Sequence, residues 1–311
     1  MGRMGFPMAD RLVQAGYEVK VWNRTRSKAE PLTDKGATLV DSPADLSGVD
    51  ILATMVSTGK DVEALYFGDN GVLSGGGVPG IFLDLSSIGT DQSAEIRGRL
   101  AEMGAAFVCS PVSGNGKCVK AGKLSAVVSG PREAFDRVEP VIEAIAANGV
   151  SYVGEGELAR FCKIAHNVML GVVTQNLAEI TILAQKAGVP RRAFLDFMNN
   201  SVMGSIFTRY KTNAFVNLDW TTTFTPALLR KDMDLGLTAG RELNVPMPVT
   251  AATREALQAH FGAATLKADP EAYLQEDFSA LLETVALASG VTLEPEGEPY
   301  PTGLEVTKAA E

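Results

Sequence analysis

The sequence is poor in the residues that most often bind metals or form disulfides. It has only three cysteines in 311 residues, Cys109, Cys118 and Cys162, and no C-x-x-C pair. An odd number leaves one thiol unpaired in any disulfide scheme, which fits a reducing compartment. The only histidines are His166 and His260, and the cysteines lack the spacing of a zinc site. We therefore expect a cytoplasmic protein without a metal site.

The chain also lacks excess positive charge, a recognisable signal peptide and a long unbroken apolar run. Its net charge is −9, whereas proteins that bind nucleic-acid backbones need clustered lysine and arginine. The most apolar long stretch, 168–187, is interrupted by polar and charged side chains, so we expect no membrane span. These absences leave a globular protein with 46% hydrophobic and 21% charged residues, long enough for two domains.

Strand-like and helix-like segments alternate up to about residue 153. This alternation predicts an α/β domain of Rossmann type, with a doubly wound, mostly parallel sheet covered on both faces. The expected strands are Tyr17–Trp22, Asp50–Val56, Ile81–Leu85, Ala105–Cys109, Leu124–Ser129 and Ser151–Val153. The expected helices are Phe6–Ala15, Ala44–Leu46, Asp61–Tyr66, Asp91–Met103 and Arg132–Ala147.

The pattern becomes helical after Gly154. A run from Glu157 to Lys186 ends at the stop signals Gly188 and Pro190, and a helix of this length extends about 45 Å. It predicts a long helix that leads into an all-α C-terminal domain. We expect a dinucleotide-binding domain over 1–155, a helical domain over 156–290 and a flexible tail over 291–311. Further helices are expected at Arg191–Asn199, Thr225–Leu243, Pro248–Phe261 and Gln275–Leu287.

The first residues read as part of a dinucleotide-binding loop. Gly2, Arg3, Met4 and Gly5 match the end of a G-x-G-x-x-G motif, whose backbone approaches a pyrophosphate at a helix N-terminus. The short apolar strand that should come before this loop is missing. We favour a true start upstream of Met1; the alternative is a protein that has lost half of its first βα unit.

The strand after this loop ends in Asn23, Arg24 and Thr25. An acidic residue here would bind the ribose hydroxyls of NAD, whereas an arginine suits a 2′-phosphate. Arg24, with help from its neighbours, therefore favours NADP(H) over NAD(H); a solvated basic turn is the alternative. Met55 and Val56, at the end of a later strand, are further candidates for cofactor contacts.

Two other strand ends carry polar groups, at the edge where open α/β sheets bind ligands. Ser87 follows the strand Ile81–Leu85 and could contact the nicotinamide side of a cofactor. A second loop contains Ser113, Gly114 and Asn115, whose hydroxyl and amide groups could bind a carboxylate. An ordinary turn is the alternative for both.

Lys163 and Asn167 are spaced i, i+4, so they project from one face of the long helix, with His166 beside them. Burial favours the neutral form of a lysine, which lets it exchange protons near neutral pH. From the spacing alone, a surface lysine is more common than a catalytic one. His166 alone fits a structural hydrogen bond better than a base.

Taken together, these motifs resemble the β-hydroxyacid dehydrogenases, the group that contains 3-hydroxyisobutyrate dehydrogenase, tartronate semialdehyde reductase and 6-phosphogluconate dehydrogenase. The likeness runs from Met1 to about Leu287. Separate motifs match in order along the chain, namely Gly2–Gly5 with Asn23–Thr25, Asp84–Ser87, Pro111–Gly114, Lys163–Asn167, Lys231–Leu237 and Glu276–Ser279.

The resemblance implies a role for each motif. Lys163 would donate and accept the proton, Asn167 would orient the substrate, and Ser113 and Gly114 would hold its carboxylate, with help from Asn115. Lys231 would line the cofactor cleft, and Ser87 would contact the nicotinamide. The substrate would be a small hydroxy acid or aldehyde, the active site would lie between two domains, and the protein would be a homodimer or homotetramer.

The chain departs from the family pattern at three places. Asn115 stands where a second glycine is usual, His166 replaces an asparagine, and Cys109-Ser110 replaces Asp-Ala. The substrate therefore cannot be carried over from the family. An imine reductase remains an alternative, although such enzymes usually lack the lysine, and so does a catalytically silent binding protein of the same fold.

Overall fold

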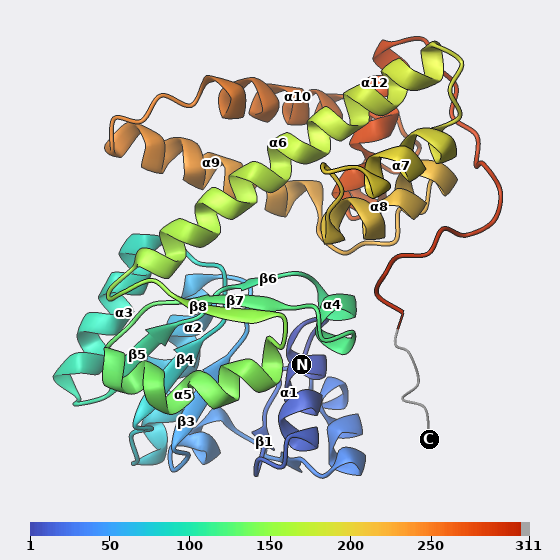
Figure 1. Ribbon diagram of the computed structural model, residues 1–311. Helices are drawn as coiled ribbons and strands as arrows, with labels where there is room; N and C mark the ends of the chain where they lie inside the picture. Colours follow the sequence, from blue (N-terminus) through green and yellow to red (C-terminus); the bar gives the residue numbers. More distant parts are fainter. Residues whose placement is uncertain (306–311) are drawn as a thin grey trace. The chain divides into compact units, whose positions relative to one another are not determined.

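The computed structural model describes residues 1–305, and the chain divides into two compact units (Figure 1). Unit 1 is Met1–Lys163 and unit 2 is Ile164–Glu311. The predicted Rossmann-type domain followed by an all-α domain is confirmed as a fold class. The domain boundaries drawn from the sequence stay predictions.

The strands of unit 1 form three small sheets that are almost entirely parallel. β1 pairs with β2, β4 lies between β3 and β5, and β7 lies between β6 and β8; only the β6–β7 pair is antiparallel. An isolated antiparallel bridge between Cys109 and Ser129 connects the ends of β5 and β7. The strands are β1 (Lys20–Val21), β2 (Thr38–Leu39), β3 (Ile51–Thr54), β4 (Ile81–Asp84), β5 (Ala106–Cys109), β6 (Val112–Ser113), β7 (Ser125–Val128) and β8 (Gly149–Tyr152).

All four residues of β4 are buried, so both faces of this strand are covered. Val62 and Ile96, from α2 and α3, share a core cluster with Phe82 of β4 and Phe107 of β5. The helices are α1 (Gly5–Gln14), α2 (Gly59–Phe67), α3 (Thr90–Glu102), α4 (Gly116–Lys120) and α5 (Arg132–Ile145), with 3-10 turns η1 (Arg26–Lys28), η2 (Glu30–Lys35), η3 (Pro43–Leu46) and η4 (Val72–Gly75).

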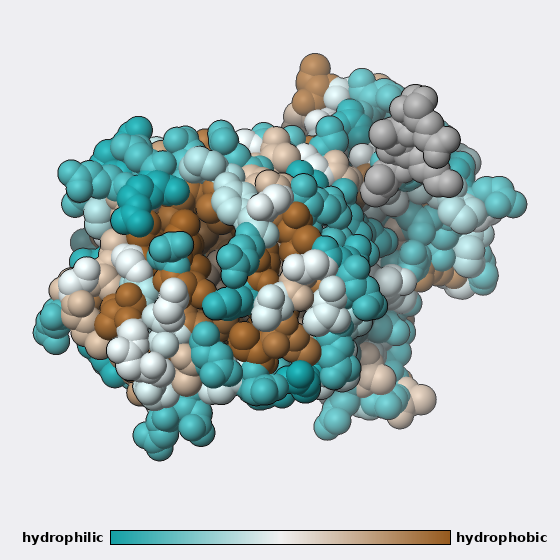
Figure 2. Space-filling view, turned by 90° about the horizontal axis from the view of Figure 1, so that it is seen from below, coloured by the Kyte–Doolittle hydropathy of each residue, from teal (hydrophilic) through white to brown (hydrophobic). Residues whose placement is uncertain are grey.

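The parallel strands of unit 1 are not joined into one sheet. Within residues 1–305, no ladder joins β1–β2 to β3–β4–β5. Ala53 is exposed in the middle of β3, and Figure 2 shows apolar side chains around a hollow on unit 1 as seen from below.

Helix α6 (Leu158–Lys186) is the long helix that the sequence predicts. Among the described residues it alone is long and apolar enough to cross a membrane, and half of its most apolar window is buried inside the protein. Core helices of globular proteins meet the same test, so this is weak evidence for a span.

Unit 2 contains helices only, within the part of the chain that the structure describes. One core cluster joins Leu177 and Ile182 of α6 to Leu195, Phe215 and Leu282. A helix is present near the predicted Gln275–Leu287, but its predicted start is wrong, because 275–277 are not helical, Phe278–Ala280 form a 3-10 turn and the α-helix begins at Leu281; a helix that the sequence did not suggest, α8, is also present. The helices are α7 (Arg191–Asn200), α8 (Ile206–Asn217), α9 (Pro226–Glu242), α10 (Pro248–Ala264), α11 (Pro270–Leu274), η5 (Phe278–Ala280) and α12 (Leu281–Ala288).

The segment after α12 contacts α7 and the end of α8. The Glu296 carboxylate accepts hydrogen bonds from the backbone N–H groups of Arg191 (3.0 Å) and Arg192 (2.8 Å). Tyr300 donates its backbone N–H to Asn213 Oδ1 at 3.1 Å. Residues 306–311 of the predicted tail lie outside the described residues, and the flexibility of 291–311 stays a prediction.

Candidate active site

The dinucleotide-binding loop precedes α1, and its geometry suits a pyrophosphate. Met4, the N-cap residue of α1, makes no side-chain capping hydrogen bond. The Phe6 N–H donates to the Gly2 carbonyl at 3.2 Å and Pro7 has no N–H, so this helix start offers an anion mainly the positive end of the helix dipole. A Cβ atom added to Gly2 would meet no atom within 4 Å. The backbone is thus open to close approach by an anion, which is what the cofactor requires.

The end of β1 lies against this loop. The Met1 amino group donates a hydrogen bond to Asn23 Oδ1, and Asn23 Nδ2 donates to the Thr25 carbonyl at 2.7 Å. Arg24 is exposed, and within residues 1–305 its guanidinium has no hydrogen bond or ion pair. Arg26, in contrast, pairs with Asp41 and Glu30. The unit therefore gathers the candidates at 2–5 and 23–25 and leaves Arg24 available to a ligand.

Hydrogen bonds also tie together the carboxyl ends of β3 and β4. Ser86 Oγ accepts the backbone N–H of Val56 at 2.9 Å, and the Ser86 N–H donates to Asp84 Oδ1 at 3.2 Å. Met55 and Val56 are thereby placed beside the loop that carries the half-buried Ser87. These three cofactor candidates share one edge of the sheet, as the parallel topology predicts.

The loop with the substrate candidates follows β6, where Ser113 lies opposite Ser125 of β7. Gly114 has φ +127°, and a Cβ atom there would lie 2.8 Å from Cys118 Cβ, so the position requires glycine. Asn115 caps α4, because its Oδ1 accepts the backbone N–H groups of Lys117 (2.9 Å) and Cys118 (3.2 Å).

Two further observations bear on this loop. Asn115 Nδ2 is buried and has no hydrogen-bond partner among the described residues. A Cβ atom added to Gly116 would lie only 2.4 Å from the Arg3 carbonyl oxygen, so the start of α4 packs directly on the dinucleotide loop. The candidates at 113–115 therefore lie near the cofactor candidates at 2–5.

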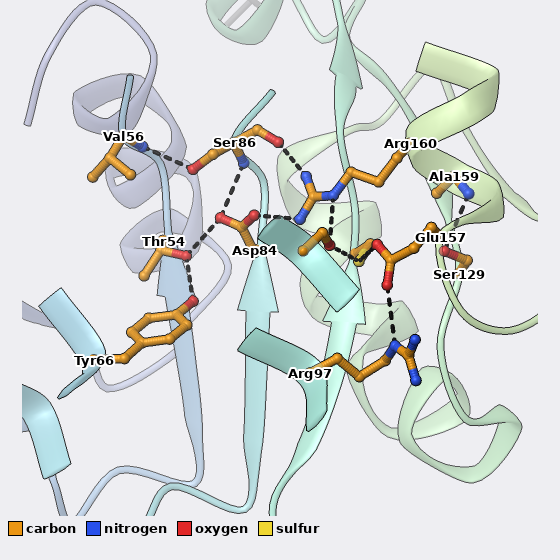
Figure 3. Close-up of polar contacts among 12 residues, drawn as sticks. Thr54, Val56, Tyr66, Asp84, Ser86, Arg97, Ser129, Glu157, Ala159 and Arg160 are labelled. Atoms are coloured by element: carbon orange, nitrogen blue, oxygen red, sulfur yellow. Dashed lines mark hydrogen bonds and ion pairs between the residues drawn. The ribbon is translucent and has the colours of Figure 1, made fainter. Parts of the chain in front are cut away.

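Lys163 is half-buried, one helical turn beyond Arg160, whose side chain is 1% exposed. The Arg160 guanidinium donates to Asp84 Oδ2 at 2.5 Å, to the Ser86 carbonyl at 2.5 Å and to Ser93 Oγ at 3.0 Å (Figure 3). The start of α6 is thus attached to the end of β4, close to Ser87. A lysine at this point of the helix is held near the predicted nicotinamide contacts.

Asn167 is buried on the same helix and belongs to unit 2. Its Nδ2 donates to Asp232 Oδ2 of α9 at 2.6 Å, and Lys231 Nζ lies 3.1 Å from Asp232 Oδ1. The exposed His166 is within 2.9 Å of Asn167 Oδ1 through Nδ1, which fits the expected structural hydrogen bond. Asp232 therefore links two residues, Asn167 and Lys231, that the sequence offers separately.

The close approach of α6 and α9 depends on two glycines. A Cβ atom at Gly236 would lie 2.2 Å from Val168 Cγ2, and one at Gly171 would lie 2.8 Å from Met233 Sδ. Small residues let helix backbones approach until short polar side chains meet. This packing brings Asp232 within reach of Asn167.

Asp84, Arg160 and Asp232 are the polar residues near the candidates that the sequence analysis left without a role. Asp84 and Asp232 lie within the motifs that contain Ser87 and Lys231. A signal for Arg160 was its place in the apolar first turns of α6, where an unpaired charge would be costly. All three cysteines are free, and the residues that the structure describes contain no metal-binding cluster.

Comparison with known proteins gives family matches over almost the whole chain. The family described as the NAD-binding domain of 6-phosphogluconate dehydrogenase matches residues 1–154. The family described as NAD-binding of NADP-dependent 3-hydroxyisobutyrate dehydrogenase matches residues 157–283.

Individual proteins agree with these matches. An uncharacterized oxidoreductase of Shewanella frigidimarina is 31% identical over 257 residues, which cover 81% of this chain and 87% of that protein. The 3-sulfolactaldehyde reductase of Escherichia coli is 28% identical over 294 residues, or 94% of this chain and 96% of that one. The structure of a Mycobacterium tuberculosis 3-hydroxyisobutyrate dehydrogenase with L-serine has a TM-score of 0.74 and 25% identity, with 91% of this chain and 96% of that chain covered. The chain belongs to the β-hydroxyacid dehydrogenase family of NAD(P)-dependent oxidoreductases.

Proposed function

We propose that this protein is an NADP(H)-preferring oxidoreductase that interconverts a small β-hydroxy acid and its semialdehyde or ketone. The observation that carries the proposal is the placement of Lys163. It lies on one face of α6 with Asn167, one turn beyond an arginine that is bonded to the end of β4. Its ammonium or amine can therefore act beside the strand ends that hold the candidate cofactor contacts.

Lys163 would be the general acid and base. In oxidation its neutral amine takes the proton of the substrate hydroxyl, and in reduction its ammonium returns a proton to the carbonyl oxygen. A bound nicotinamide supplies the hydride acceptor for oxidation and the hydride donor for reduction. Asn167 would orient the substrate oxygen, and its hydrogen bond to Asp232 leaves its amide oxygen in a fixed direction.

The loop 113–115 would hold the substrate carboxylate. The Ser113 hydroxyl and the backbone around Gly114 offer hydrogen-bond donors without a buried charge. Asn115 Nδ2 is a further donor that has no partner among residues 1–305, which supports its participation. These donors would fix the acid end of the substrate while its hydroxyl carbon faces the cofactor.

Arg24 would give the preference for NADP(H). Its exposed guanidinium suits a 2′-phosphate, and the residues at 2–5 suit the pyrophosphate. Met55, Val56 and Ser87 would contact the nicotinamide half of the cofactor, and Lys231 would contact it from the helical domain. The second matching family is described as belonging to an NADP-dependent enzyme, which supports this choice.

The two domains would divide the binding of cofactor and substrate between them. Residues 1–155 would bind the dinucleotide, and residues 156–290 would bind substrate and form a homodimer or homotetramer. We place the protein in the cytoplasm, since its three cysteines are free. A nucleic acid is not a proposed partner, because the net charge is −9.

A substrate screen tests this function. Small 3-hydroxy acids and their aldehydes are assayed with both cofactors, together with a cyclic imine that represents the imine reductase alternative. We expect Lys163→Ala to fold and bind cofactor but to lose about 10²–10⁴-fold in turnover. Lys186→Ala, at the exposed end of the same helix, is the matched control and keeps wild-type turnover.

Three outcomes would reject the proposal. Turnover of the imine alone would favour the imine reductase. Cofactor binding without turnover of any compound would favour the silent binding protein. A Lys163→Ala variant as active as wild type would remove the lysine from the reaction.

A further inference from the structure

Arg160 is the most completely bonded buried cation of unit 1 among the described residues. Its guanidinium donates to Asp84 of β4, to the loop carbonyl of Ser86 and to Ser93 of α3. A planar guanidinium with donors in fixed directions can satisfy all three only in one orientation. The bonds therefore define both the position of the first turns of α6 and their rotation about the helix axis.

The carboxylate that receives Arg160 is itself fixed. Asp84 is 0% exposed, and its Oδ1 accepts hydrogen bonds from Thr54 Oγ1 (2.9 Å) and the Ser86 N–H (3.2 Å). Tyr66 supports Thr54 through a 2.7 Å bond between the two hydroxyl groups. The contacts in Figure 3 thus run from Tyr66 and Thr54, through Asp84, to Arg160 of α6.

Asp84 favours the charged form of Arg160. Burial alone would lower the pKa of the Arg160 guanidinium, but the charge and hydrogen bond of Asp84 raise the pKa above its usual value. Glu157, at the start of the helix, forms an ion pair with Arg97 at 3.0 Å. The N–H of Ala159 donates to Ser129 Oγ at 3.1 Å. The first turn of α6 is therefore held from several sides.

We propose that Arg160 is a positioning residue, which sets the location of the Lys163 amine through its bond to Asp84. The two side chains are spaced i, i+3 and so lie on adjacent turns of one helix surface. A shift or rotation of the helix turn that carries Arg160 also moves Lys163. The inference rests on the function proposed above for Lys163.

Stability alone is a poor explanation for this ion pair. Buried ion pairs contribute little more to folding than apolar side chains of similar volume, since both charges lose their hydration. Their geometric demands are much stricter, and an error of about 1 Å in the placement of a catalytic group can cost about 10²-fold in rate. A network that orients Lys163 accounts for the position of Arg160 beside the candidate site.

The test compares two buried arginine-to-lysine changes. Arg160→Lys keeps the positive charge but loses the planar guanidinium with its several N–H donors. Arg191→Lys, in unit 2, makes the same change at a side chain that is also 1% exposed and donates to the Phe215 carbonyl at 2.8 Å. Turnover is expressed per cofactor-binding site, so that misfolded protein does not count. The cofactor dissociation constant and the primary deuterium isotope effect with deuterated reduced cofactor are measured in parallel.

We expect Arg160→Lys to lower kcat by about 10²-fold, with unchanged cofactor affinity and a larger isotope effect, because the chemical step becomes slower. We expect Arg191→Lys to lower stability while it keeps kcat and the isotope effect per site. Wild-type values for both quantities in Arg160→Lys, or equal losses in the two variants, would overturn the inference.

A milder variant covers the case in which Arg160→Lys does not fold. Ser93→Ala removes the hydroxyl that accepts from Arg160 Nε and that also contacts Cys109 Sγ at 3.4 Å, while it keeps the bonds of Arg160 to Asp84 and Ser86, and we expect a smaller fall in kcat with the same rise in the isotope effect. An unchanged kcat in Ser93→Ala would then overturn the inference. Failure of the proposed function is a separate result, since it would appear as full activity in Lys163→Ala, whatever the variants of Arg160 and Ser93 show.

Discussion

Asn167 of α6 and Asp232 of α9 are joined by a 2.6 Å hydrogen bond from the asparagine Nδ2 to the aspartate Oδ2. Both residues are 4% exposed, so the bond is shielded from water. A carboxylate can only accept here, which fixes the asparagine amide with its oxygen directed away from Asp232. The pair therefore orients a residue that we propose to contact the substrate.

Replacing Asp232 with alanine should therefore weaken the orientation of the substrate by Asn167 and leave the fold of unit 1 unchanged. We expect kcat/KM for the hydroxy acid to fall by about 10–10²-fold, because Asn167 loses its fixed orientation. Asp234→Ala is the matched control, since Asp234 lies on the same helix but is exposed and pairs with Arg254 at 2.7 Å. Equal kcat/KM values in the two variants would show that Asp232 has no such role.

The cofactor preference can be tested at Arg24. A hydrogen bond to a charged group contributes about 1.5–3 kcal/mol, so we expect Arg24→Ala to raise the KM for NADPH by roughly 10–100-fold. The KM for NADH should change little, because NADH has no 2′-phosphate. Arg26→Ala serves as the control, since Arg26 already pairs with Asp41 and Glu30. Equal losses with both cofactors would contradict the assigned preference.

The sequence predicts the large elements because their signals are local. Alternating strands and helices indicate the parallel sheet, and the run after Gly156, in which Gly171 is the sole glycine or proline up to Lys186, indicates α6. The helix α8 gives no such signal, since its buried face carries polar side chains, among them Thr208, Lys211 and Thr212. These polar residues interrupt the apolar positions of the segment and so weaken the pattern on which helix prediction depends.

The error at the last predicted helix also has a tertiary cause. Asp277 is extended, with φ −72° and ψ 141°, and its carboxylate bonds to Lys211 and to Thr223. These partners come from distant parts of the chain and hold the backbone out of the helical conformation. The 3-10 turn Phe278–Ala280 follows this residue, and the α-helix begins after the turn, at Leu281.

In the candidate site, too, local motifs are predictable from the sequence and long-range contacts are not. Motifs within short stretches, such as Lys163 with Asn167, are visible in the sequence. The pairings are not, because Arg160 and Asp84 are 76 residues apart and Asn167 and Asp232 are 65 apart. Sequence reasoning placed Asp84 and Asp232 inside motifs, but only the packing of β4 and α9 against α6 shows what they bond.

His260 lies in unit 2 and gives a prediction about acid stability. Its ring is fully buried, and Nδ1 is 2.8 Å from Thr284 Oγ1. Burial lowers the pKa of this imidazole from 6.5 to about 4, although the nearby Glu283 carboxylate opposes the shift. The folded protein therefore holds His260 neutral at pH values where the unfolded chain binds a proton. Its contribution to stability is complete above about pH 6.5 and is lost as the pH falls toward 4.

We accordingly expect the free energy of unfolding of unit 2 to fall by about 3 kcal/mol between pH 7 and pH 4 through this one group. Urea titrations followed by Trp220 fluorescence in a Trp22→Phe background measure it, since Trp220 bonds to Glu283 beside the histidine. His260→Gln should flatten the pH dependence of the free energy of unfolding above pH 4.5. Carboxylates such as Asp277 do not yet titrate in that range, because Lys211 lowers the pKa of Asp277 in spite of its burial. His166→Gln, which changes the exposed histidine, should keep the wild-type slope. A slope that survives in His260→Gln would assign the acid sensitivity to another group.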